Sequence, residues 1–153
     1  METNPDQDLL RELERAEAAP YVDYPPTPAW YFPAAGAWFA GITGMQGLTE
    51  DHLPIALVLL VVLIGALGAF CAWYAGYRGA MPSMLRRAPR GMGPMFALYF
   101  VGAALIFGAV WTTGHAAGWG WASALTFVLA TTGLWLHEKS YGAAAARVRE
   151  RLS

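Results

Sequence analysis

Long apolar runs alternate with short polar segments along the chain, and four of the runs have the length of a membrane span. A spanning helix needs roughly 20 mostly apolar residues, because the hydrocarbon layer is about 30 Å thick and a helix rises about 1.5 Å per residue. None of the four runs contains Asp, Glu, Lys or Arg, although serine and threonine dilute the run at 117–137 and a proline with repeated glycines weakens the run at 29–48. The pattern predicts transmembrane helices at about 29–48, 53–77, 94–113 and 117–137.

The polar segments complete the predicted architecture, which is all-α: an integral membrane four-helix bundle with a helical extension at each end. Residues 1–28 predict an acidic amphipathic helix followed by a proline-rich connector, and residues 138–153 predict a basic helical tail. The composition agrees, since 56% of residues are hydrophobic and only 14% are charged, against about 25% charged in soluble domains. A net charge of −1 gives no reason to expect a nucleic-acid partner.

The basic residues predict the orientation, because Lys and Arg near the membrane ends mark the cytoplasmic side. Four Arg lie between the second and third runs, whereas the connections between the first and second and between the third and fourth have no Lys or Arg. A plasma-membrane protein with both termini in the cytoplasm fits this distribution. The alternative is that residues 29–48 form an interfacial or re-entrant segment, which leaves three spans and an external N-terminus. Arginines expected to reach lipid headgroups are Arg86, Arg87, Arg90, Arg147, Arg149 and Arg151.

Most Trp and Tyr residues fall near the ends of the predicted spans, as expected for aromatic belts at the two interfaces. Two aromatic residues, Trp38 and Tyr99, lie within the spans and need another explanation.

The N-terminal segment carries a leucine stripe, Leu9, Leu10 and Leu13, opposite its acidic face. Anionic lipid would repel such a helix, so the stripe is expected to face protein. The surface that it contacts is either the Arg-rich loop of the same chain or another subunit. The C-terminal tail is expected to continue the fourth span, with a break near Gly142.

Small residues spaced by four predict close helix packing, because in lipid the backbones associate most readily where side chains are small. Three such ridges are present, one in each of the first, second and fourth predicted spans. Their members are Gly36, Ala40 and Gly44; Gly68, Ala72 and Gly76; and Ala116, Gly120 and Ala124.

Candidate chemistry is sparse. No ionisable residue lies at mid-membrane, where transport paths usually carry one, and small multidrug exporters need a glutamate in their first helix that this chain lacks. His52, Asp51 and His115 flank the predicted spans on one side and are the only candidates for a metal or haem site. The alternative for Asp51 is a helix N-cap before Leu53. No cofactor and no enzymatic activity are expected.

Two stretches, ERAEAAPYVDYPPTPAWYFP at residues 14–33 and SYGAAAARVRERLS at residues 140–153, carry a resemblance. With this architecture, the chain resembles uncharacterised small four-span membrane proteins of high-GC, actinobacterial-type bacteria. The resemblance implies no activity and no site residues. The expected function is a non-enzymatic accessory, scaffold or small subunit of a membrane complex. Its expected partners are the lipid bilayer and another membrane protein or a second copy. The alternative is an oligomeric small transporter or channel.

Overall fold

The computed structural model is helical throughout its regular structure, with no strand in any part that it describes. The described residues are 9, 12–16, 18–19, 23, 25–78 and 93–152. The long helices are α2 (Tyr31–Asp51), α3 (Leu53–Arg78), α4 (Gly93–Ala117) and α5 (Trp119–Leu152). Residues 12–16 and 18–19 of the N-terminal segment are also helical. The predicted all-α class is therefore confirmed.

Prolines lie at the starts of three of the long helices. Pro33, Pro54 and Pro94 each fall within the first three residues of a helix. A missing N–H there removes no intrahelical hydrogen bond. Only His52 separates α2 from α3.

Two sequence expectations about α5 are wrong. The helix runs without a break through Gly142, because one helical glycine costs only about 1 kcal/mol and good helix formers surround it. Ala116 does not belong to this helix, since Gly118, with φ of 96°, separates it from α5. The ridge predicted from Ala116, Gly120 and Ala124 is therefore split between two helices.

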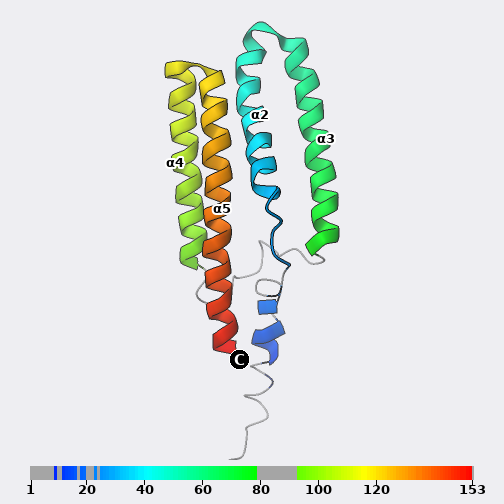
Figure 1. Cartoon of the computed structure of the whole chain (residues 1–153), viewed down its shortest axis with the longest axis vertical. Coiled ribbons are helices and arrows are strands. Elements are labelled where there is room, and N and C mark those ends of the chain that lie inside the picture. The colour runs from blue at the N-terminus through cyan, green and yellow to red at the C-terminus, as the bar shows by residue number, and fades with distance from the viewer. Residues whose placement is uncertain are drawn as a thin grey trace, which may run out of the picture.

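The four long helices form an open row in the order α3, α2, α5, α4, with each helix antiparallel to its neighbours (Figure 1). Close backbone contacts join only the neighbouring pairs among the described helices. Both hairpin connections lie at one end of the row, and α5 extends beyond the other helices at the opposite end (Figure 1). The expected bundle is thus not closed around a shared core, because α3 and α4 do not meet.

The centre of the row is the contact between α2 and α5, where glycines on one helix face larger side chains on the other. A Cβ added at Gly36 would overlap the Thr131 hydroxyl, so the two backbones approach as only glycine permits. Ser123 Oγ also donates a hydrogen bond across the interface to the Ala40 carbonyl at 2.7 Å. Two further contacts in the same register are Gly44 with Ser123 and Gly47 with Trp119.

The contact between α2 and α3 explains Trp38. Its indole Nε1 donates to the Leu63 carbonyl at 2.9 Å, which joins the two helices at mid-length. Nearer the lower end, aromatic rings of both helices pack together, with 4.8 Å between the ring centroids of Trp30 and Trp73. Neither contact requires a belt at a membrane interface.

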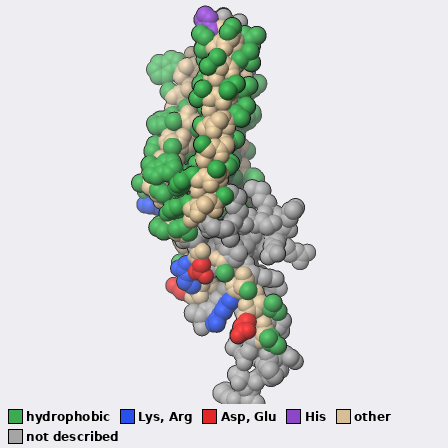
Figure 2. Space-filling model, turned by 90° about the vertical axis from the view of Figure 1, so that its right-hand side faces the viewer, with side chains coloured by type: hydrophobic (Ala, Val, Ile, Leu, Met, Phe, Trp, Pro, Cys, Tyr) green, Lys and Arg blue, Asp and Glu red, His purple; other side chains and the backbone are tan. Residues whose placement is uncertain are grey.

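The outer helices are the most apolar. Both α3 and α4 are long and apolar enough to cross a membrane, and nearly all of their side chains are exposed on the molecule. Figure 2 shows the face that carries α3: hydrophobic side chains cover its upper part, and charged ones gather below. Such a continuous apolar surface is unfavourable in water. The central helices α2 and α5 carry hydroxyls and glycines in the contact that joins the two helices.

Gly36→Ala is expected to lower the free energy of unfolding by about 1–3 kcal/mol, because overpacking at this site forces α2 away from α5. The matched control is Gly65→Ala on α3, where an added Cβ meets nothing within 4 Å. Reversible unfolding in mild detergent would measure both. Equal stability of the two variants would contradict the observed α2–α5 contact.

Candidate functional site

An apolar groove of about 640 Å³ runs along α5 between α2 and α4. It exists because α4 packs on α5 but not on α2. Small residues deepen it. The lining residues that the argument uses are Gly102, Tyr99, Trp111, Trp119, His137 and Ser140.

The groove is uncharged along its walls and polar at its ends. Its described lining includes no Lys, Arg, Asp or Glu. At the lower end the rings of Tyr99 and His137 are 4.8 Å apart between centroids, and Ser140 Oγ donates to the His137 carbonyl at 2.8 Å. This packing on His137 accounts for Tyr99, which the aromatic belts left unexplained.

Two hydroxyls in the groove lining join α2 and α5. The Thr43 and Thr126 Oγ1 atoms are 3.1 Å apart, and Thr126 also donates to the Ala122 carbonyl at 2.7 Å. Thr126 is buried. Its hydroxyl thus contributes to helix packing. In the sequence, Thr126 only made an apolar run less hydrophobic, and this did not indicate a packing role.

The candidate histidines occupy different surroundings. The His115 ring packs edge-to-face against both Trp111 and Trp119, with centroid distances of 4.7 and 5.5 Å. His52 is exposed at the end of α2, and its backbone N–H donates to the Leu48 carbonyl. The described part of the chain contains no group of three His, Cys, Asp or Glu side chains suited to a metal.

Asp51 does not act as the N-cap before Leu53. It is the last residue of α2, and His52 occupies the position before α3. The Asp51 side chain lies outside the described residues.

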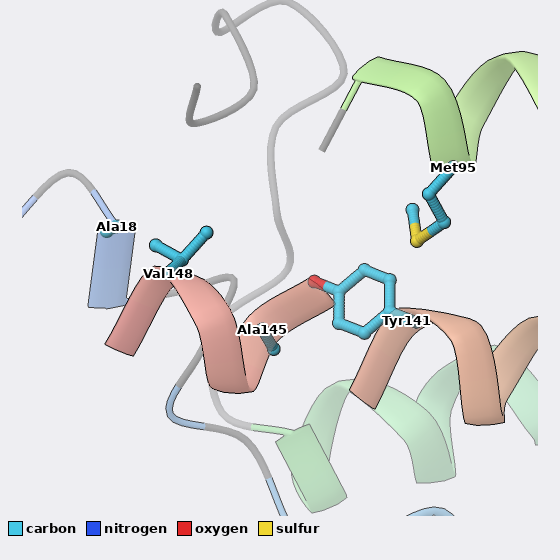
Figure 3. Close-up of a cluster of buried hydrophobic side chains, with 5 residues drawn as sticks. All are labelled: Ala18, Met95, Tyr141, Ala145 and Val148. Atoms are coloured by element: carbon cyan, nitrogen blue, oxygen red, sulfur yellow. The ribbon is translucent and has the colours of Figure 1, made fainter. Parts of the chain in front are cut away.

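Below the row, the N-terminal segment packs on the extension of α5. Ala18 is buried in a cluster with four other side chains, three of them from that extension (Figure 3). The cluster members are Ala18, Met95, Tyr141, Ala145 and Val148. We call the N-terminal segment and residues 138–152 of α5 the lower layer. Among the described residues, this segment therefore packs with α5 and with Met95 of α4. The Arg-rich loop lies outside the described residues.

Hydrogen bonds hold the connector that leads from the lower layer to α2. Thr27 Oγ1 donates to Glu138 Oε1 at 2.7 Å, and the Tyr77 hydroxyl donates to the Pro26 carbonyl at 2.8 Å. Asp23 and Arg149 form an exposed ion pair at 3.7 Å, which contributes little because water screens it. The connector thus ties the lower layer to both α3 and α5.

The leucine stripe faces outward in this arrangement. Leu9 and Leu13 are 59% and 60% exposed, and Leu10 lies outside the described residues. The chain therefore does not use these two side chains to bury its own core.

The remaining predicted residues are distributed as follows. Gly36 and Gly44 face α5 across the central contact, whereas a Cβ added at Gly68, Gly76 or Gly120 meets nothing within 4 Å. Ala72 and Ala124 are exposed and Ala40 is half-buried. The ridge on α3 is thus turned away from the described helices, and its packing role stays a prediction.

The predicted headgroup arginines have these positions. Arg147 Nε donates to the Ala143 carbonyl at 3.3 Å, and Arg149 pairs with Asp23. Arg151 is exposed near the end of α5. Arg86, Arg87 and Arg90 lie outside the described residues. Their binding to lipid headgroups stays a prediction.

Comparison with protein-family models, curated proteins and solved structures finds no significant match for the chain. The sequence signal for the groove was weak, because its mostly apolar lining residues come from three helices and form no motif. The order of the helices had to be known before these residues could be placed on one surface.

Thr126→Val is expected to lower the free energy of unfolding by about 1 kcal/mol, since interhelical hydrogen bonds in membranes contribute roughly that much. Its control is Thr112→Val, because the exposed Thr112 donates only within α4, to the Gly108 carbonyl. Unfolding in mild detergent would compare them. A larger loss for the control would contradict the role given to Thr126.

Proposed function

We propose that the chain is a four-span plasma-membrane protein with both termini in the cytoplasm, and that it acts as a non-enzymatic accessory or scaffold subunit of a membrane complex. Its partner in this proposal is another membrane protein, which it contacts through the lower layer.

The arrangement of the helices supports four spans. The less apolar α2 and α5 lie between α3 and α4, each of which is apolar enough to cross a membrane. At 21 residues, α2 measures about 31 Å, which matches the hydrocarbon thickness. A helix so flanked, antiparallel to both neighbours, would enter the same layer as they do.

The charge distribution supports the orientation. Lys139, Arg147 and Arg149 lie on the α5 extension, at the end of the row opposite both hairpin connections (Figure 1). Cytoplasmic placement of this end follows the positive-inside rule.

The exposure of Leu9 and Leu13 is the observation that carries the accessory role. Apolar side chains on α3 and α4 would be covered by lipid, but these leucines belong to the lower layer, which water would surround. Burying each of them in a partner would contribute about 1.5–3 kcal/mol. The same segment is already anchored by Ala18, so less freedom would be lost on binding.

With both termini in the cytoplasm, a reporter that is active only in the cytoplasm should give a signal when it is fused to Met1 or to Ser153. A reporter that is active only outside should give none at either position. The connection at His52 should instead accept a reporter that works outside. An external signal from the Met1 fusion would favour three spans with a re-entrant first segment.

Leu9→Asn combined with Leu13→Asn is expected to abolish co-purification of the partner in mild detergent, because the docking surface loses its apolar contacts. Glu12→Gln with Glu14→Gln is the control, since both residues are exposed on the same helical segment. Mass spectrometry of the purified material would identify the companion. A clean monomer from the unaltered chain would contradict the accessory role.

A further inference from the structure

We propose that the groove along α5 binds an isoprenoid quinone, with the hydrocarbon tail between α2 and α4 and the quinone ring at Tyr99, His137 and Ser140. The proposal rests on the membrane position of the four helices given under the proposed function. It does not depend on the accessory role.

The dimensions of the groove favour a single tail. Its lining on α4 extends from Leu98 to Trp111, about 20 Å along the helix axis. An extended isoprenoid tail can lie along that length against side chains that are mostly apolar.

The absence of charge from the described lining favours a neutral head group. A phospholipid phosphate would need a cation or several strong donors at its site, and no Lys or Arg is found among the lining residues that the structure describes. A quinone carries two carbonyl oxygens and needs only hydrogen-bond donors. The Tyr99 hydroxyl and the His137 ring supply neutral donor groups at one end of the groove, whereas the Ser140 hydroxyl there already donates to the His137 carbonyl.

The aromatic lining fits the same ligand. The rings of Tyr99 and His137 are tilted by 51° to each other, so a flat head group can stack on the face of one ring. Toward the upper end, Trp111 and Trp119 line the tail portion, with 6.1 Å between their ring centroids. Only binding is proposed, and no electron transfer is assigned.

The test titrates the full chain, in nanodiscs of zwitterionic phosphatidylcholine, with a short-tailed menaquinone and follows tryptophan fluorescence. Because Trp111 and Trp119 line the groove, binding should quench the emission and saturate. Native mass spectrometry should show one quinone per chain. Quenching that rises linearly without saturation would mean partition into the bilayer and would overturn the proposal.

Two variants locate the binding. Gly102→Leu fills the groove at a position where an added Cβ meets nothing within 4 Å, and it should weaken binding about tenfold or more. Gly108→Leu is the matched control, because Gly108 is equally unobstructed on α4 but does not line the groove. Equal affinity of the two variants would overturn the proposal.

A head-group variant keeps the test decisive if Gly102→Leu fails to fold. Tyr99→Phe preserves the ring and removes only the hydroxyl, so weaker quinone binding with unchanged thermal unfolding is expected. Competition by anionic phosphatidylglycerol that abolishes quinone binding would identify a phospholipid site and contradict the quinone. Failure of the topology reporters would contradict the membrane placement itself.

Discussion

The close approach of α2 and α5 is the contact on which the rest of the structure depends. In lipid there is little hydrophobic force between helices, so backbone proximity and interhelical hydrogen bonds must hold them. Gly36 gives Thr131 room, and Ser123 donates to the Ala40 carbonyl. Each outer helix then joins one central helix as its hairpin partner. This connectivity produces an open row, and an open row leaves a groove on α5.

The sequence predicted the helices far better than their order. A bilayer fixes the length of a span, so the apolar runs at residues 53–77 and 94–113 gave helix positions within a few residues. The order depends on complementary surfaces, and the ridges at Gly36 and Gly68 look alike in the sequence. Only the first meets a matching set of side chains on another described helix. That match involves residues about 83 positions apart, which no local pattern encodes.

The candidate site was predictable only in fragments. His115 could be recognised as an imidazole near a helix end, but its contact with Trp119 depends on the turn at Gly118. Trp38 and Tyr99 stood out because interfacial belts did not explain them, and both proved to make tertiary contacts. Aromatic residues that the interfacial belts did not explain were thus good indicators of tertiary contacts. The groove itself needs three helices to be placed, so no segment of the chain could reveal it.

The unbroken α5 connects the two surfaces to which roles have been assigned. Ser140 lines the groove, and the adjacent Tyr141 is buried in the lower layer with Ala18 (Figure 3). Between His137 and Tyr141 the helix makes about one turn, so the two surfaces lie on consecutive turns of one helix. A break at Gly142 would have separated Ala145 and Val148 from the part of α5 that lines the groove. Its absence means that one continuous helix carries both the groove and the cluster that includes Ala18.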